Sequence, residues 1–210
     1  DSEYYFGDKI YRGGVAEGEQ YAFFTRAVLD CIPNLDFRPD VVHCNDWHTA
    51  MLPMLAKTQY PGAMQEKIKY LLTIHNIAFQ GKFDFSYVED LLSVNSQYYT
   101  SEFMELYGCA NFMKGGCVFA DRINPVSPSY AKEILDPYYG EGLQGILSAR
   151  QHELSGIING IDYDVNNPEK DPNILHHFNV ENWKTEKVKN KLALQREVGL
   201  PENEDVPLIG

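Results

Sequence analysis

The sequence predicts an α/β protein in which helices flank a parallel sheet. Two apolar runs, residues 41–44 and 68–74, each end in a cluster of polar side chains. Parallel strands of an open sheet deliver side chains to a crevice at their carboxyl ends in this way. Residues 48–59 between them have a helical pattern, so the segment predicts a β-α-β unit. The chain has 210 residues, 44% hydrophobic and 13% aromatic, which is enough for a packed core.

A helix is predicted before this unit, and it ends before Pro33. Its apolar side chains recur at intervals of three and four residues, which is helical spacing: Tyr21, Phe24, Val28 and Cys31. Pro33 ends the pattern, because proline lacks the N–H that a helix interior needs. We therefore expect a helix of about four turns with these side chains along one face.

The signals between the second and third strands are weaker. Residues 87–94 and 103–107 favour short helical segments within a helical connection. Residues 111–120 have helical spacing, with an apolar face that contains Met113, Cys117 and Ala120. This helix leads into a third predicted strand at residues 122–126.

Helix signals follow the third strand. Ser127-Pro128 places a cap and a proline at the N-terminus of a helix that runs through Leu135. The elements expected after it, in chain order, are a helix at 142–151, a fourth strand at 154–158, a helix at 185–198 and the opening of a strand at 206–210. Gly199 is suited to the C-terminal cap of the last helix.

The charge balance narrows the classes of partner. Lys and Arg number 18 against 30 Asp and Glu, a formal net charge of -12, which argues against nucleic acid and against an anionic membrane. No apolar run approaches the roughly 18 residues that a membrane span needs. The cysteines form no C-x-x-C pair and favour reduced core thiols over a disulfide or a metal: Cys31, Cys44, Cys109 and Cys117. We expect a cytoplasmic protein.

Polar residues gather at the carboxyl ends of the predicted strands, and their convergence is our hypothesis for the site. The clusters are His43 with Asn45, Asp46 and His48; His75 with Asn76 and Gln80; Ser127 with Ser129; and Asn159 with Asp162. Together with neighbouring aromatic residues, such side chains hydrogen-bond hydroxyl groups and stack on sugar rings. From the chemistry alone, carbohydrate is the ligand class that we infer.

Each of these residues has a structural alternative. Asp46 and Ser127 occupy positions typical of helix N-caps, and a histidine inside a strand, such as His43, is more often a hydrogen-bonded core residue than a ligand. A metal site built from His43 and His48 would need the loop to fold back, so we expect no metal. Asn159-Gly160 is typical of a turn.

No nucleotide-binding or nucleophile motif competes with this hypothesis. The chain has no nucleophile elbow and no P-loop, and its glycine pairs, Gly13-Gly14 and Gly115-Gly116, lack the G-x-G-x-x-G spacing after a strand. Hydrolase and nucleoside-triphosphatase functions therefore have no support in the sequence.

Four blocks of the sequence carry a resemblance to a known family. They are RPDVVHCNDWH at 38–48, TIHNIAFQG at 73–81, ADRINPVSPSYA at 120–131 and SGIINGID at 155–162. In order and spacing these blocks closely resemble the bacterial glycogen synthases and plant starch synthases that use ADP-glucose. In that family two Rossmann-like domains face each other across a deep cleft, the GT-B arrangement of glycosyltransferases.

The resemblance implies a domain organisation. Residues 1–165 would be the later part of the N-terminal, acceptor-side domain, a partial Rossmann-like fold with its early strands missing. Residues 166–205 would be a linker and helix that lead to the nucleotide-binding domain, which would begin at 206–210 and is truncated. The strand at 41–44 would then be an exposed sheet edge through which two copies of the chain can dimerise.

The resemblance also implies a reaction, in the cytoplasm or in the plastid of a plant. Glucose is transferred, with retention, from the donor substrate ADP-glucose to the nonreducing end of an α-1,4-glucan, and no cofactor is implied. His75 matches the active-site histidine and Asp46 a residue of the donor-glucose pocket, so both are expected catalytic residues. The expected substrate-binding residues are Asn159, Asn76, His48, Gln80, Tyr98 and Tyr99. An oxocarbenium-like transition state would need positioning and electrostatic stabilisation from these groups.

One residue departs from the pattern of the family, which usually has His-x-His-Asp-Trp. This chain has Asn45 in the second histidine position, and since asparagine holds no charge, a titratable role there is in doubt. The chain alone is expected to be inactive. Two alternative functions are another retaining GT-B glucosyltransferase and a noncatalytic glucan-binding module.

Overall fold

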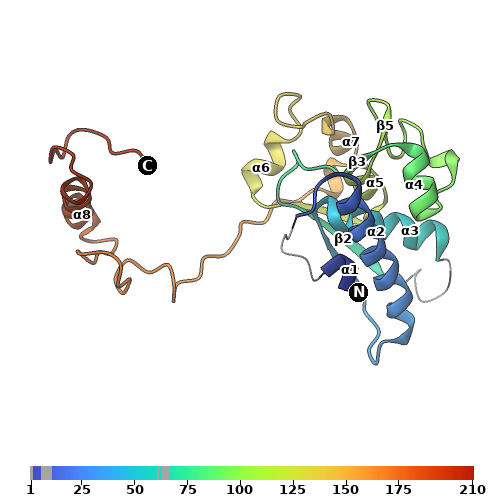
Figure 1. Ribbon diagram of the computed structural model, residues 1–210, viewed down its shortest axis with the longest axis horizontal. Coiled ribbons are helices and arrows are strands. Elements are labelled where there is room, and N and C mark those ends of the chain that lie inside the picture. Colours follow the sequence, from blue (N-terminus) through green and yellow to red (C-terminus); the bar gives the residue numbers. More distant parts are fainter. Residues whose placement is uncertain (1, 6–10, 61, 63–66) are drawn as a thin grey trace. The chain divides into compact units, whose positions relative to one another are not determined.

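The computed structural model describes residues 2–5, 11–60, 62 and 67–210. The chain divides into two compact units, Asp1–Asn159 and Gly160–Gly210 (Figure 1). The first unit contains the strands and all the described helices except α8, which belongs to the second. The domain division expected from the resemblance, 1–165, 166–205 and 206–210, concerns a longer protein and stays a prediction.

A parallel sheet lies in the first unit, as predicted. It contains β1 (Val41–Asn45), β2 (Lys69–Ile74) and β6 (Arg122–Pro125), in the order β1-β2-β6. Val41 lies opposite Lys69 and Leu71 opposite Arg122. The central strand β2 is the most deeply buried of the three, with Leu72 and Ile74 fully inside the core. The fold class, α/β with a parallel sheet and flanking helices, is confirmed.

Two helices that pack on each other connect the strands. α3 (Asp46–Gln59) follows β1 directly, and α5 (Phe112–Phe119) leads into β6. Their backbones approach closely at Gly116, where a Cβ would lie only 2.7 Å from the Cβ of Ala50. The predicted apolar face of α5 is buried: Met113, Cys117 and Ala120.

The first long helix, α2 (Gly14–Cys31), is longer than predicted and buries a different face. Its buried side chains include Ala22, Thr25 and Leu29. Phe24 and Cys31, which belong to the predicted stripe, are exposed. The reason lies at Gly18, where a Cβ would meet the ring of Phe83 at 2.6 Å. The glycine at position 18 allows that approach.

A second, antiparallel sheet corrects the prediction of a helical turn at 103–107. β3 (Lys82–Phe83), β5 (Cys109–Asn111) and β4 (Glu105–Leu106) pair in that order. Tyr107 and Gly108 both have positive φ, 53° and 81°, as in two-residue hairpin turns. Because tyrosine is unusual in that turn, the hairpin leaves little trace in the sequence. The shorter helical elements are α1 (Ser2–Tyr5), η1 (Ile32–Asn34), α4 (Phe85–Leu92) and η2 (Ser96–Tyr98).

The cap predicted after the third strand is confirmed. Ser127 precedes α6 (Pro128–Glu133), and its hydroxyl accepts the N–H groups of Ser129 and Tyr130. The helix predicted at 142–151 is present as α7 (Gln144–Ala149) followed by η3 (Gln151–Glu153).

The predicted fourth strand runs beside β6 but forms only an isolated bridge, between Leu154 and Ile123. Ser155 donates its N–H to the Ile123 carbonyl at 3.0 Å, and Ile157 donates to Pro125 at 3.1 Å. At Gly156 a Cβ would lie 2.1 Å from the Ser127 carbonyl oxygen. The chain therefore passes this point only because the residue is glycine.

The second unit contains α8 (Trp183–Glu197), which matches the last predicted helix. Gly199 has φ 73° and its N–H bonds to the Arg196 carbonyl, so the expected glycine cap is confirmed. Gln195 is buried and accepts the N–H of Asn203 at 2.9 Å. Residues 206–210 form no strand among the residues that the structure describes.

Two of the four cysteines are core thiols, as expected. Cys44 and Cys117 are buried, and burial raises the pKa of each thiol to about 12. Cys31 is exposed and Cys109 half-buried. In the described part of the chain, no helix combines the length and the apolar character that a bilayer span requires.

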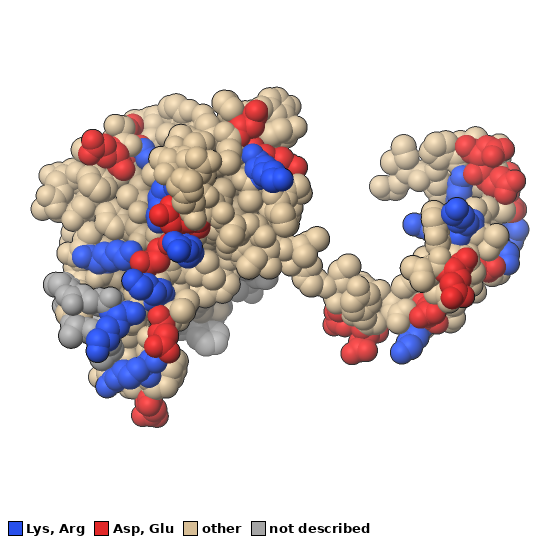
Figure 2. Space-filling model, turned by 180° about the vertical axis from the view of Figure 1, so that it is seen from behind, with Lys and Arg blue, Asp and Glu red and all other residues tan. Residues whose placement is uncertain are grey.

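Acidic and basic side chains intermix on the rear face of the first unit (Figure 2). Within that unit, Lys57 and Lys69 lie 3.3 Å and 3.7 Å from the carboxylate of Asp121. Partial burial raises the pKa of Asp121, but the N–H of Tyr70 and the two lysines outweigh it and hold that pKa below its ordinary value. Asp121 therefore ties β2 to the start of β6.

Candidate active site

A cavity of about 690 Å³ opens at the carboxyl ends of β1 and β2. Its aromatic walls come from Tyr11, Trp47, Phe79 and Phe83. Its polar side chains come from Glu17, Asp46, His48, Asn76, Gln80 and Lys82. The structure thus brings four of the predicted site residues, from two strand ends, to one cavity.

Asp46 connects the two strand ends. It is the first residue of α3, and its φ of 52° is in the left-handed region. Its Oδ1 accepts the backbone N–H of His75 at 2.8 Å and that of Asn76 at 3.4 Å. The carboxylate therefore holds the turn after β2 and does not cap its own helix, so the N-cap alternative for Asp46 is wrong.

His75 is exposed, and Asn45 fixes its ring. The Nε2 atom of His75 lies 3.0 Å from Oδ1 of Asn45. Because an amide oxygen can only accept a hydrogen bond, Nε2 of His75 is the donor in this contact. The Asn45 backbone is held in turn by Thr49, whose hydroxyl oxygen accepts the Asn45 N–H at 2.6 Å. Asn45 thus replaces the family's histidine with a neutral acceptor.

His48 lies in an aromatic setting. Its ring centroid is 4.4 Å from those of Tyr21 and Trp47, and its Nε2 atom is 3.7 Å from the carboxylate of Glu17. Burial lowers the pKa of His48, and the opposing effects of Asp46 and Glu17 are smaller. The imidazole is therefore neutral near pH 7 and can exchange hydrogen bonds with hydroxyl groups.

Asn76 and Gln80 shape the loop after β2. The Oδ1 atom of Asn76 accepts the N–H of Ala78 at 3.0 Å. Gln80 is buried, and its Nε2 donates to the carbonyls of Ile77 and Glu141, each at 3.0 Å. Both amide hydrogens of Gln80 are therefore used inside the protein, which makes this residue a brace for the cavity wall.

Further bonds fix the same loop. The Oε1 atom of Gln80 accepts from Nδ2 of Asn111 at 2.7 Å. Gly81 has φ 63°, and a Cβ there would lie 2.3 Å from the Trp47 ring. The hydroxyl of Tyr130 accepts the N–H of Ile77 at 3.0 Å. The loop is thus preorganised before any ligand binds.

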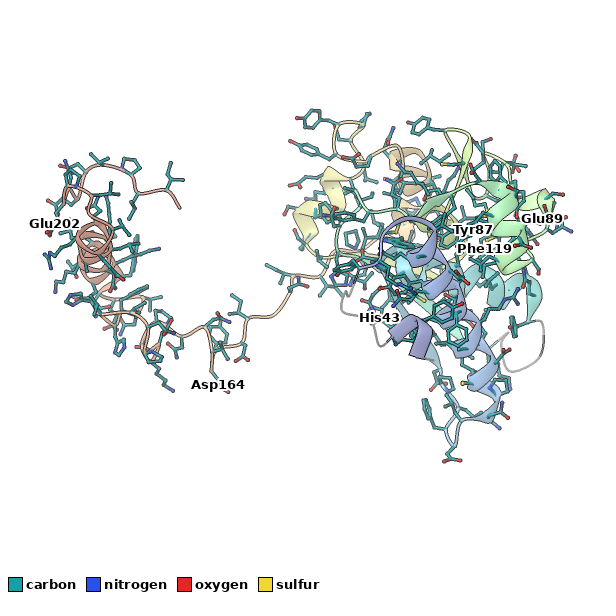
Figure 3. All side chains as sticks on the ribbon, viewed as in Figure 1. His43, Tyr87, Glu89, Phe119, Asp164 and Glu202 are labelled. Atoms are coloured by element: carbon teal, nitrogen blue, oxygen red, sulfur yellow. The ribbon has the colours of Figure 1, made fainter. Side chains whose placement is uncertain are left out.

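His43, labelled in Figure 3, belongs to a hydrogen-bonded row across the sheet. Its Nε2 lies 2.6 Å from the hydroxyl of Thr73, which also accepts from Nδ2 of Asn124 at 3.3 Å. His43 is hydrogen-bonded, as its structural alternative predicts, although its side chain is exposed. No group of three or more His, Cys, Asp or Glu side chains within the described ranges is arranged to hold a metal ion.

His75 and the remaining predicted residues are not among the residues that line this cavity, as far as the described residues show. Tyr98 packs against Phe103 and Phe119 with ring centroids 5.3 Å and 5.9 Å away. Tyr99 packs on Phe85 and donates its hydroxyl to the Val94 carbonyl. Asn159 is exposed at the end of the first unit. Contacts of these three residues with a substrate stay predictions.

Two cavity residues were not expected from the sequence. Glu17 is buried, accepts the Gly13 N–H at 2.6 Å and faces His48. Tyr11 comes from the segment before α2, and its ring centroid is 6.2 Å from that of His48. Both lie far from the strand ends in sequence, so only the folded packing of α2 on α3 reveals them. A carboxylate on the buried face of α2 is the signal available for Glu17.

The fold and the site define an α/β protein whose ligand crevice lies at the carboxyl ends of parallel strands. Residues 1–149 match the family described as the starch synthase catalytic domain, and the chain belongs to this family. The resemblance seen in the sequence is thereby confirmed.

Curated relatives and a solved structure agree. A glycogen synthase of Lachnospira eligens is 46% identical over 212 residues, covering 100% of this chain and 44% of the relative. One from Geobacillus thermodenitrificans is 47% identical over 210 residues, covering 100% of this chain and 43% of the relative. The catalytic domain of starch synthase IV from Arabidopsis thaliana, bound to ADP and acarbose, has a TM-score of 0.77 at 28% identity, covering 95% of this chain and 41% of that one. The chain spans less than half the length of these relatives.

Proposed function

We propose that the chain is the acceptor-side part of a glycosyltransferase that transfers glucose from ADP-glucose to the nonreducing end of an α-1,4-glucan, with retention. The observation that carries the proposal is the hydrogen bond that the backbone N–H of His75 donates to the carboxylate of Asp46, a residue that lines the cavity. Support comes from the family, from relatives named glycogen synthase, and from the solved structure, which is bound to ADP and acarbose.

In the proposed reaction, the chain contributes positioning and electrostatics. The Asp46 carboxylate fixes the peptide of His75, while Asn45 fixes the imidazole ring, so both groups of His75 are oriented before the sugar arrives. Preorganised dipoles of this kind stabilise charge that develops in an oxocarbenium-like transition state. ADP-glucose enters the proposed reaction as a substrate, and we propose no cofactor beside it. We assign it to the cytoplasm, or to a plastid in a plant.

His75→Ala in the full-length protein tests the proposal. Incorporation of labelled glucose from ADP-glucose into glycogen should fall by several orders of magnitude in kcat, because the oriented imidazole of His75 is lost. His152→Ala is the matched control, since His152 is also an exposed histidine of the first unit. Near-normal turnover of His75→Ala would contradict its role. The same incorporation assay with UDP-glucose in place of ADP-glucose tests which nucleotide sugar is the donor.

The chain alone gives a second test. Because it spans only 44% of a glycogen synthase relative, we expect the 210-residue chain to transfer no glucose when it is supplied with ADP-glucose and glycogen. Incorporation by this chain would refute that expectation. Glucan retention without any transfer by the full-length protein would instead favour a noncatalytic glucan-binding module.

A further inference from the structure

Three exposed tyrosines project from two loops of the first unit. Tyr107, at the β4–β5 turn, is 79% exposed, and Tyr138 and Tyr139, in the loop between α6 and α7, are 82% and 51% exposed. None of them belongs to the cavity lining found among the described residues. We call these three residues the tyrosine surface.

The two loops are in contact. The ring of Tyr107 lies across Gly142, where a Cβ would meet ring atom Cε2 at 2.8 Å and the phenol oxygen at 3.1 Å. Gly142 has φ 88°, a conformation that glycine adopts readily. Gly142 therefore leaves room for the ring, and the Tyr107 turn and the 138–142 loop form one surface.

Folding alone gives no reason for a tyrosine at position 107. Its φ of 53° is left-handed, which is unfavourable for a side chain with a Cβ, and this turn position favours Asn, Asp or Gly. The ring regains little by burial, since 79% of the residue is exposed. Residues whose strained backbone is not offset by burial of the side chain cluster at functional sites.

The loop that carries the other two tyrosines is ordered by its own hydrogen bonds. The carboxylate of Asp136 accepts the N–H of Tyr138 at 2.8 Å, and its carbonyl accepts those of Tyr139 and Gly140 at 3.1 Å and 2.9 Å. The two rings stand edge to face, with centroids 4.8 Å apart and planes at 85°. The rings are therefore held in place at the surface.

One hydrogen bond links this loop to the cavity. Gln80, which lines the cavity, donates its second amide hydrogen to the carbonyl of Glu141. The wall of the cavity and the loop that carries Tyr138 and Tyr139 are thus joined through a single side chain. The loop that carries Tyr138 and Tyr139 therefore adjoins the cavity wall at Glu141.

The chemistry of the surface selects the ligand class. Residues 136–142 contain two tyrosines, a proline and the carboxylates Asp136 and Glu141, but no Leu, Ile, Val or Met and no Lys or Arg. Carboxylates repel a polyanion, and the loop has no Met or Arg, two of the residue types that are enriched in protein interfaces. Tyrosine rings stack on the apolar faces of sugar rings, while carboxylates accept sugar hydroxyls.

We propose that the tyrosine surface binds an α-1,4-glucan chain at glucose units remote from the reacting end. This inference rests on the proposed function, because it takes the ligand of the cavity to be the glucan acceptor. The surface gives the protein a preference for long acceptors over short ones.

The test compares glycogen with maltotriose as acceptors of the full-length protein. In the triple variant Tyr107→Ala, Tyr138→Ala, Tyr139→Ala, the ratio of kcat/KM for glycogen to that for maltotriose should fall about tenfold, the effect of roughly one stacking contact. Tyr163→Ala is the matched control, since Tyr163 is 71% exposed in the second unit. An unchanged ratio in the triple variant overturns the proposal.

Tyr107→Asn separates binding from folding. Asparagine suits the left-handed turn, so this variant should unfold at a higher temperature than the wild type and still bind glycogen more weakly. Glycogen binding is measured by retardation in gels that contain glycogen, which needs no catalysis. Equal retardation of wild type and triple variant overturns the glucan surface, whereas retardation of the wild type without glucose transfer contradicts only the proposed function.

Discussion

At the scale of single residues, Asp46 combines a left-handed backbone conformation with a side-chain hydrogen bond that holds the turn after β2. Its left-handed φ is tolerated by Asp and Asn better than by other residues, and its carboxylate accepts the His75 N–H. Asp46→Asn keeps an oxygen acceptor and a suitable backbone, so we expect it to retain the stability of the wild type. Asp46→Ala should lose about 1–3 kcal/mol of unfolding free energy. Urea unfolding of both variants measures this, and equal losses would contradict the account.

Activity assays on the same pair separate charge from position. If the negative charge of Asp46 contributes to transfer, Asp46→Asn lowers kcat while its fold stays intact. If the carboxylate acts only through the His75 peptide, Asp46→Asn retains turnover and only Asp46→Ala loses it.

His48 makes the free energy of unfolding depend on pH. Its lowered pKa means that the unfolded chain takes up a proton at higher pH than the folded protein does. The unfolding free energy is therefore highest above about pH 6.5, the ordinary histidine pKa, and decreases as the pH falls through the lower folded-state pKa. Glu17 and Asp46 face the ring and reduce the effect without reversing it.

In His48→Gln this part of the pH dependence should disappear. Urea unfolding of both proteins between about pH 5 and pH 8 measures it. His152→Gln, an exposed histidine of the same unit, is the control and should keep the slope of the wild type. Parallel curves for the wild type and His48→Gln would show that another group causes the dependence.

At the scale of elements, the crossing of α3 and α5 depends on one glycine. A Cβ at Gly116 would lie 2.8 Å from the backbone oxygen of Ala50, which cannot move aside as a flexible side chain can. We expect Gly116→Ala to cost about 1–3 kcal/mol by overpacking. Gly145→Ala is the matched control, because Gly145 is also helical and a Cβ there meets nothing within 4 Å. Thermal unfolding of the two variants measures the difference, and equal melting temperatures would contradict it.

The elements also show which features can be predicted from sequence. β1 and β2 were predictable because each is a local apolar run that ends in polar residues. The meeting of Asp46 with the residues after β2 followed from the rule that parallel strands end at one edge. The β4–β5 hairpin was not predictable, because Tyr107 occupies a position where Asn or Gly normally marks the turn.

Long-range packing accounts for the rest of the site. Glu17 reaches His48 only because α2 packs inside the first unit, with Gly18 against the ring of Phe83, and no local pattern encodes that approach. Gln80 was expected to contact substrate, but its amide hydrogens bond to the carbonyls of Ile77 and Glu141, the second distant in sequence. Such partners are set by the fold as a whole.

At the scale of the whole molecule, β1 lies at an edge of the described sheet. It pairs with β2 on one side only, and Val41 is 56% exposed. An unpaired edge can pair with another copy, so we expect the 210-residue chain to sediment as a dimer. Val41→Lys should shift it toward the monomer, because a charged side chain at an edge disfavours strand pairing. A monodisperse wild-type monomer would count against this prediction.

The hydrogen-bonded row of His43, Thr73 and Asn124 crosses all three strands of the parallel sheet. Successive side chains of a strand point to opposite faces, so a pairing shifted by one residue would move Thr73 away from both partners. Thr73 and Asn124 are buried, and a misaligned sheet would break the bond between the Thr73 hydroxyl and Nδ2 of Asn124 inside the core. The row therefore makes wrong strand alignments costly, and it selects the correct alignment while the chain folds, before any sugar is bound.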